Sequence, residues 1–218
     1  MRFEAVFTAL ACAGLAVAAF AQEKDDGEIL IEEFLRDITT ISGRFEQQLI
    51  DADDNVVETS AGTLDIERPG RFRWSYSDPY RQELIADGLN MWSYDVDLEQ
   101  VTVKPQAEAL SSTPALLLGG TTDVLEDFSY IGSFADNDTT WVLLRPKDTD
   151  SGFNKVELGF TDGALTRMLF GDNLEQTTLI ALFDVAFNEP IDAATFAFTP
   201  PDGVDVVGQP SDAPAADL

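Results

Sequence analysis

Residues 56–76, VVETSAGTLDIERPGRFRWSY, decide the fold class, because apolar and polar side chains alternate on both sides of a break at residues 68–70. After the break, Phe72, Trp74 and Tyr76 fall on one face. Arg71, Arg73 and Ser75 fall on the other. A period of two is typical of a half-buried β-strand. The stretch therefore predicts two strands joined at Arg68-Pro69-Gly70.

The same period continues along most of the chain and predicts an all-β domain. Strands are expected at 45–49, 56–66, 71–76, 82–86, 91–96, 98–103, 129–134, 140–145, 153–160, 165–170, 177–187 and near 196–198. No change in composition divides the chain, so we expect one domain. A single sheet of this many strands is expected to curl toward a barrel as its twist accumulates.

Two helical regions interrupt the strands. Residues 27–41 are expected to form a helix that ends at Ser42-Gly43, because five apolar residues recur at helical spacing: Ile31, Phe34, Leu35, Ile38 and Ile41. Residues 113–120 predict a short helix with Thr113 as its cap and Pro114 in its first turn. Residues 123–128 are expected to add a second short helix. The 113–120 segment is unusually apolar for a connection between strands.

The two ends of the chain have their own signatures. Residues 1–21 are typical of a secretory signal peptide, with Arg2, an apolar run and Ala-Phe-Ala at 19–21. A lipid anchor on Cys12 is the alternative, although Ala9-Leu10-Ala11 before it fits such a signal poorly. We expect a domain at 22–207 and a disordered tail at 208–218, which is polar and contains Pro and Ala.

Charge and composition exclude several functions. Acidic residues outnumber basic ones by 40 to 13, which gives a net charge of −27 and disfavours nucleic-acid binding. The excess either keeps the protein soluble or steers it toward a basic partner. The chain has no histidine, and its one cysteine lies in the expected signal peptide. Ser-His-Asp and Cys-His catalysis and the usual zinc sites are thereby excluded. We expect no enzyme, no metal and no cofactor.

A series of short motifs in order resembles a known family. They are FEQ at 45–47, GTLDIERPGRFRW at 62–74 with Pro79, ADG at 86–88, WSY at 92–94 and Gln100 after it, TPALL at 113–117, DAATF at 192–196, and FTPP at 198–201. Together they resemble the periplasmic outer-membrane lipoprotein carrier family, LolA. The resemblance covers essentially all of the expected mature chain.

The resemblance implies an incomplete antiparallel barrel of about eleven strands, with an N-terminal helix and short lid helices over its concave face. It implies a periplasmic carrier that takes triacylated lipoproteins from an inner-membrane ATP-driven release complex and passes them to an outer-membrane acceptor. Arg68 is implied to latch the lid by hydrogen bonds to its backbone carbonyls. We expect a monomer. A lipid- or lipoprotein-sensing module of the same fold is the alternative function.

Binding acyl chains requires apolar area, because exposing one chain of about fifteen methylenes to water costs on the order of 12 kcal/mol. The candidate wall residues are Leu64, Ile66, Phe72, Trp74, Tyr76, Trp92 and Tyr94. The candidate lid residues are Pro114, Leu116, Leu117 and Leu118. The alternation alone leaves open whether the wall residues line a cavity or form a solid core.

Overall fold

The computed structural model describes residues 25–106, 114–119, 122–148 and 151–211; the side chains of 114–116 and 122–124 lie outside the description. In these residues the strands are β1 (Thr40–Ile50), β2 (Val56–Glu67), β3 (Arg71–Asp78), β4 (Gln82–Asp87), β5 (Asn90–Asp95), β6 (Gln100–Pro105), β7 (Phe128–Asp136), β8 (Thr139–Pro146), β9 (Phe153–Thr161), β10 (Ala164–Asp172), β11 (Thr177–Phe187) and β12 (Asp205–Val207). The helices are α1 (Asp26–Asp37), α3 (Pro114–Gly119) and the 3-10 turns η2 (Thr122–Asp127) and η3 (Ala193–Phe196).

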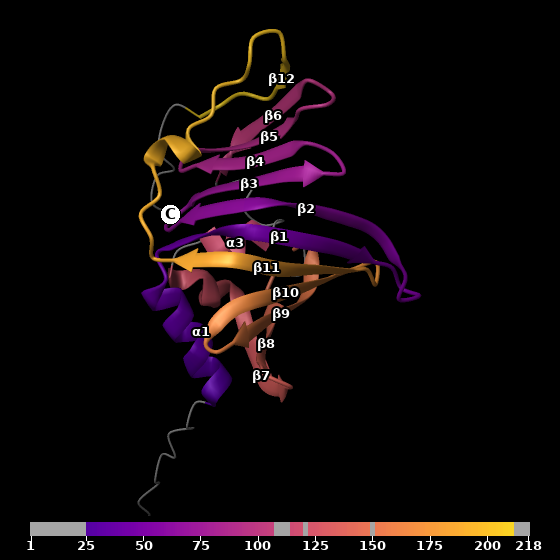
Figure 1. The fold of residues 1–218 in the computed structure, drawn as a ribbon, viewed down its shortest axis with the longest axis vertical. Helices are drawn as coiled ribbons and strands as arrows, with labels where there is room; N and C mark the ends of the chain where they lie inside the picture. The colour runs from indigo at the N-terminus through magenta and orange to yellow at the C-terminus, as the bar shows by residue number, and fades with distance from the viewer. Residues whose placement is uncertain (1–24, 107–113, 120–121, 149–150, 212–218) are drawn as a thin grey trace, which may run out of the picture.

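The strands form one curved sheet whose two edges do not meet (Figure 1). Its order is β12-β6-β5-β4-β3-β2-β1-β11-β10-β9-β8-β7, so β1 and β11, at opposite ends of the chain, lie side by side. Strands β1 to β11 pair antiparallel, whereas β12 pairs parallel with β6. The expected unclosed, mainly antiparallel sheet is confirmed. The described part of the chain has twelve strands rather than about eleven.

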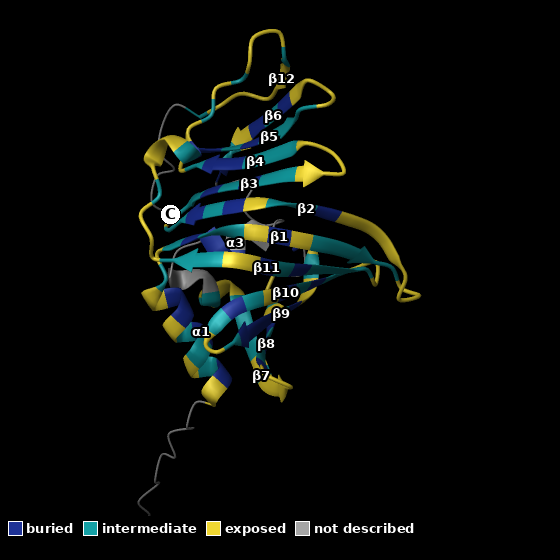
Figure 2. Ribbon diagram, viewed as in Figure 1, coloured by how far each residue is buried: buried dark blue, intermediate teal, exposed yellow. Residues whose placement is uncertain are grey.

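The alternation in β2 and β3 gives the sheet two different faces. Phe72 and Trp74 pair with Ile66 and Leu64 of β2, and all four are buried in one large apolar cluster (Figure 2). Helices α1 and α3 contribute to the same cluster, so they cover this concave face. The opposite, convex face carries Arg71 and Arg73. The sequence period thus decides which side chains meet the helices.

Helix α1 begins and ends for local reasons. Asp25 caps it by accepting a hydrogen bond from the Glu28 amide at 3.0 Å. The helix was expected to reach residue 41, and this was wrong, because it ends at Asp37. Residues 38–41 are β-branched, and Thr40 and Ile41 pair with β2 while Ile41 also pairs with β11. Ser42 and Gly43, expected to end the helix, lie inside β1.

The C-terminal segment crosses the convex face from β11 to β6 (Figure 1). The strand expected near 196–198 was wrong: Asp192 accepts a hydrogen bond from the Ala194 amide at 2.9 Å and caps η3 instead. Phe196 is buried beneath Arg71, whose guanidinium carbon lies 5.8 Å from its ring centre. The twelfth strand arises further on, where Asp205–Val207 pairs with β6. Close packing against the sheet, not alternation, sets this segment's shape.

The structure describes residues 208–211, although the tail expected to be disordered begins at residue 208. The Ser211 amide donates to Asn90 Oδ1 at 2.7 Å, and Asn90 Nδ2 donates to the Ser211 carbonyl at 3.2 Å. The rest of the expected tail and the expected signal peptide lie outside the described residues. No helix in the described residues is long and apolar enough to span a bilayer.

Candidate functional site

The concave face under the two helices is lined mainly by apolar side chains. Leu64, Ile66, Phe72 and Trp74 are each at most 2% exposed, and Tyr76 packs at the edge of the same cluster. From α3, Leu117 and Leu118 enter this cluster at 4% and 0% exposure. The structure therefore brings five of the seven predicted wall residues together with two of the predicted lid residues. The side chains of Pro114 and Leu116 lie outside the described part of the chain.

Trp92 and Tyr94 are not brought to this face. They belong to a second cluster on the convex side, where their rings lie 5.5 and 5.8 Å from the ring of Phe198. The Trp92 indole N–H also donates to Asp87 Oδ2 at 2.7 Å. The register explains the difference, because Met91 of β5 occupies the concave face and its neighbour must point away. These two residues pack against Phe198 of the C-terminal segment.

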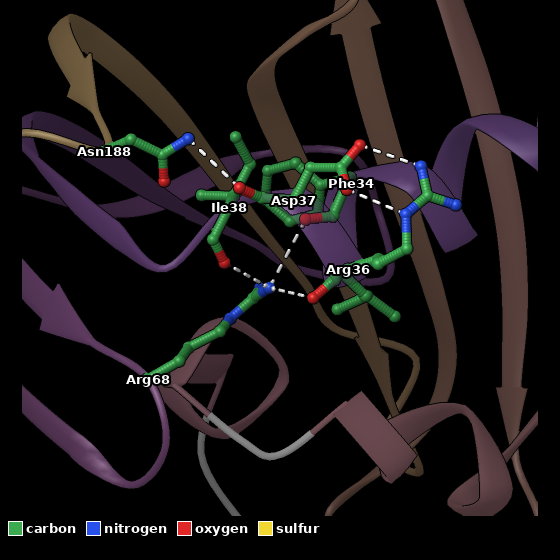
Figure 3. A network of polar contacts seen from close by, with 7 residues as sticks. Phe34, Arg36, Asp37, Ile38, Arg68 and Asn188 are labelled. Atoms are coloured by element: carbon green, nitrogen blue, oxygen red, sulfur yellow. Dashed lines mark hydrogen bonds and ion pairs between the residues drawn. The ribbon is translucent and has the colours of Figure 1, made fainter.

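Arg68 joins both helices to the sheet from its place just after β2. Its Nε donates to the Leu118 carbonyl of α3 at 2.6 Å. Its Nη1 donates to the last carbonyls of α1, those of Leu35 and Ile38 at 3.1 Å and of Phe34 at 3.4 Å (Figure 3). The planar guanidinium can serve several carbonyls at once, which an ammonium cannot do in the same geometry. One side chain thus links two helices that are far apart in sequence.

The charge of Arg68 sits in an unusual environment. Burial lowers the pKa of Arg68 to about 10, so the guanidinium is charged at neutral pH. It lies at the C-terminal end of α1, where the helix dipole favours a cation, and 5.1 Å from the centre of the Phe34 ring. Its Nη2 is buried without a partner in the described residues. The cation is therefore held by carbonyls and a ring, which makes its contacts sensitive to helix movement.

Helix α3 has a second tether next to Arg68. The Gly70 amide donates to the Gly119 carbonyl at 2.7 Å. A Cβ on Gly119 would lie 3.4 Å from Phe72 Cδ1, so this end of α3 is in van der Waals contact with the sheet. Six residues of helix are thus held by two hydrogen bonds and by two buried leucines. Neither hydrogen bond belongs to the pairing of the strands.

Two amide side chains that sequence reasoning missed brace this region. Asn188, just after β11, accepts from the Thr39 amide at 2.8 Å and donates to the Asp37 carbonyl at 3.0 Å, which fixes the end of α1 (Figure 3). Gln106 donates to the Gly70 carbonyl at 2.6 Å and accepts from the Gly88 amide at 3.1 Å. Their only sequence signal is a polar amide directly after a strand, which is too common to single them out.

A shallow groove of about 400 Å³ lies outside the apolar face, between α1 and the loops of β8 to β10. Its floor includes Ile29, Leu30 and Phe160. Its rim is acidic, formed by Asp26, Glu33, Asp138 and Asp162.

Tyr76 marks the polar edge of the concave face, and its titration is a test of the packing there. Its hydroxyl donates to Gln47 Oε1 at 3.2 Å, and burial raises its pKa to about 12 from an ordinary value of 10. Since the unfolded chain loses this proton first, the contribution of Tyr76 to stability should be lost as the pH rises from about 10 to about 12.

We expect Tyr76→Phe to remove the last part of the phenolate absorbance change in an alkaline titration. The chain has four tyrosines, so the missing signal is about a quarter of the total. Tyr80→Phe is the control, because Tyr80 is 69% exposed. A Tyr76→Phe difference spectrum that develops near pH 10 would show that the hydroxyl is not buried in solution.

An unclosed, mainly antiparallel half-barrel whose apolar concave face is covered by an N-terminal helix and a short inserted helix defines a LolA-like fold. Its fold is shared with solved structures at low sequence identity. An uncharacterized conserved protein from Thermus thermophilus matches 83% of this chain and 96% of its own, with a TM-score of 0.51 and 14% identity. A LolA superfamily protein from Nitrosomonas europaea matches 78% and 95%, with a TM-score of 0.50 and 11% identity.

Sequence comparison shows the family of this chain as well as its fold. The pattern of the outer membrane lipoprotein carrier protein LolA matches residues 36–199. The outer-membrane lipoprotein carrier protein of Halorhodospira halophila is 41% identical over 81% of this chain and 83% of its own. That of Dechloromonas aromatica is 39% identical over 82% and 86%. The chain belongs to the LolA family of outer membrane lipoprotein carriers, and it is a transport protein rather than an enzyme.

Proposed function

We propose that this protein binds the acyl chains of lipoproteins on its concave face and carries them across the periplasm. The observation that supports this most directly is the mainly apolar surface beneath α3, with Arg68 and Gly70 holding that helix in place. Residues 1–21 would direct export and be removed, which leaves a domain at 22–207. The carrier would work as a monomer.

In this proposal α3, residues Pro114–Gly119, is the lid, and its docked position on the sheet is the closed, cargo-free one. Leu64, Ile66, Phe72, Trp74 and Tyr76 become the wall against which acyl chains lie once the lid moves. The side chains that form a solid core in the closed protein are then the ones that bind cargo. The proposal thus assigns the solid core to the closed lid position and the cavity to the open one.

The free energy of lid docking can be compared with that of removing an acyl chain from water. Burial of two leucines contributes about 2 kcal/mol each. The neutral bond from Gly70 contributes about 1 kcal/mol, and the bond from the charged Arg68 about 1.5 kcal/mol. Lid docking is therefore worth on the order of 6 kcal/mol. Removing one acyl chain of about fifteen methylenes from water is worth on the order of 12 kcal/mol. A single chain can thus displace the lid, and lid closure returns part of that free energy when cargo leaves.

Directed transfer requires partners at both membranes. A membrane complex that uses ATP would supply the lipoproteins on the inner side, since leaving the bilayer is uphill. An acceptor at the outer membrane would take them. The carrier itself needs only to bind reversibly, because differential affinity between successive partners sets the direction. With a net charge of −27, docking through basic partner surfaces is favoured.

We expect the mature protein to bring lipoproteins into the soluble fraction when it is incubated with cells stripped of their outer membrane. Acyl chains would be shielded on the concave face, so the complexes should stay soluble without detergent. The measurement is lipoprotein in the supernatant, with and without ATP and with a heat-denatured carrier as control. If functional release machinery is present and no lipoprotein appears, the proposed function is wrong.

A further inference from the structure

A polar spot interrupts the otherwise apolar concave face. Trp74 and Tyr76 lie two residues apart on the same face of β3, and the ring of Phe45 packs between them, 4.9 Å from Trp74 and 5.1 Å from Tyr76. Gly62 makes room for this arrangement, because a Cβ there would lie 1.8 Å from the Ser75 carbonyl oxygen and 3.0 Å from Phe45 Cε1. The aromatic cluster therefore contains two polar groups on the concave face, the Trp74 indole N–H and the Tyr76 hydroxyl.

The indole N–H of Trp74 is the unexplained group in this cluster. Trp74 is 2% exposed, and its Nε1 is buried with no hydrogen-bond partner in the described residues. It lies near enough to Tyr76 to lower the pKa of that hydroxyl slightly against the larger effect of burial, yet it completes no hydrogen bond to it. A buried donor without an acceptor costs free energy in the closed protein. Phenylalanine would fill similar space without that cost.

Gln47 supplies a second polar group, joined to this cluster by a hydrogen bond from Tyr76. It lies opposite Ser60 of β2 and one alternation beyond Phe45 on β1, so it faces the concave side. Its Oε1 accepts the hydrogen bond from Tyr76 at 3.2 Å, which orients the carboxamide and leaves the two amino protons outside this bond. Gln47 and Trp74 thus offer donors, and Tyr76 positions Gln47.

We propose that Trp74 and Gln47 form a subsite for a carbonyl oxygen in the ester linkages that join cargo acyl chains to their glycerol. An ester contributes acceptors and no donor, which matches a site whose unused groups are donors. The hydrocarbon chains would lie along the apolar wall, and the ester linkage would lie at Trp74 and Gln47. This subsite rests on the proposed function and adds to it a recognition of the linkage, which sets how deeply the chains enter.

The test compares two synthetic lipopeptides with the same peptide and the same pair of long saturated chains. In one the chains are joined to S-glyceryl-cysteine by esters, and in the other by ethers that lack the carbonyls. We expect the mature protein to bind the ester probe about tenfold more tightly, as one or two additional neutral hydrogen bonds would give.

The variants separate hydrogen bonding from packing. Trp74→Phe should bring the ester-to-ether affinity ratio close to one, mainly by weakening the ester probe. Gln47→Leu and Tyr76→Phe should lower the ratio in part, and Tyr76→Phe removes only one oxygen atom if Trp74→Phe fails to fold. Tyr80→Phe, at a site 69% exposed, is the matched control and should keep the full ratio.

A spectroscopic readout is independent of affinity. The three tryptophans give three indole N–H resonances, and Trp74→Phe identifies that of Trp74. The ester probe should shift this resonance downfield and the ether probe should not, whereas the Trp92 N–H is already bonded to Asp87 and serves as an internal reference. Equal binding of both probes with no shift would overturn the subsite and leave the carrier function standing. Failure of both probes to bind would overturn the proposed function and the subsite with it.

Discussion

Arg68→Leu is expected to slow handover of cargo to an acceptor by at least about tenfold while leaving cargo uptake intact. The variant removes the hydrogen bonds to Leu118 and to the end of α1. Bonds to a charged donor are worth about 1.5–3 kcal/mol each, part of which offsets the burial of the cation. A net loss of about 2 kcal/mol in the closed protein changes its population ~30-fold. Release is affected because lid closure accompanies the departure of cargo.

The measurement is the rate at which a labelled lipoprotein moves from the carrier to a purified acceptor. Arg68→Lys is the matched variant: it keeps the charge but loses the planar fork that reaches two helices, so its rate should fall between those of Arg68→Leu and the parent. Equal handover rates for all three proteins would remove Arg68 from the mechanism. A variant that also fails to take up cargo would instead indicate a structural defect in α1.

Leu118→Asp is expected to open the lid permanently and to lower the stability of the cargo-free protein by several kcal/mol. Leu118 is 0% exposed and lies in the main cluster, where an unpaired carboxylate is strongly unfavourable. The loss is limited to the free energy of lid docking, on the order of 6 kcal/mol, because α3 can leave the sheet without unfolding it. Cargo should then be retained, as in Arg68→Leu.

Hydrogen exchange at the Gly70 amide reports the lid directly, since this amide donates to the Gly119 carbonyl. Its protection should disappear in Leu118→Asp and persist in Leu118→Met, which conserves volume and polarity. The double variant with Arg68→Leu should be no slower in handover than the slower single variant, because both disrupt the same closed state. Continued protection of Gly70 in Leu118→Asp would contradict the lid assignment.

Much of the sheet could be predicted from local pattern alone. The strands at 71–76 and 177–187 were expected from their alternation, and the structure has β3 at Arg71–Asp78 and β11 at Thr177–Phe187. The pattern failed where a tertiary contact outweighed it. Ile38 and Ile41 continue the helical stripe of α1, yet pairing with β2 and β11 takes Ile41 into β1. Phe196 and Phe198 alternate as in a strand, but neither lies in one. On the convex face Phe196 packs under Arg71, and Phe198 packs against Trp92.

The candidate site could be predicted in part. Leu64, Ile66, Phe72 and Trp74 lie on one face of β2 and β3, as the unbroken alternation there predicts. Trp92 and Tyr94 show the same alternation on β5, but alternation does not say which of the two faces is concave. That choice depends on the register between β4 and β5, which places Met91 opposite Ala86 and turns the aromatic pair outward.

By itself, the sequence determined a β-rich domain with an apolar inserted helix, no catalytic histidine or cysteine, and membership in a carrier family. The β-rich domain and the missing residue types follow from composition and short-range periodicity, which the chain carries locally. The family follows from the resemblance of its motifs. Only the tertiary structure decided that Arg68 contacts α1 as well as α3, and that Trp74 has a buried donor without a partner among the residues described. Such features depend on side chains brought together from distant parts of the chain, where small differences in packing distance decide which atoms find partners.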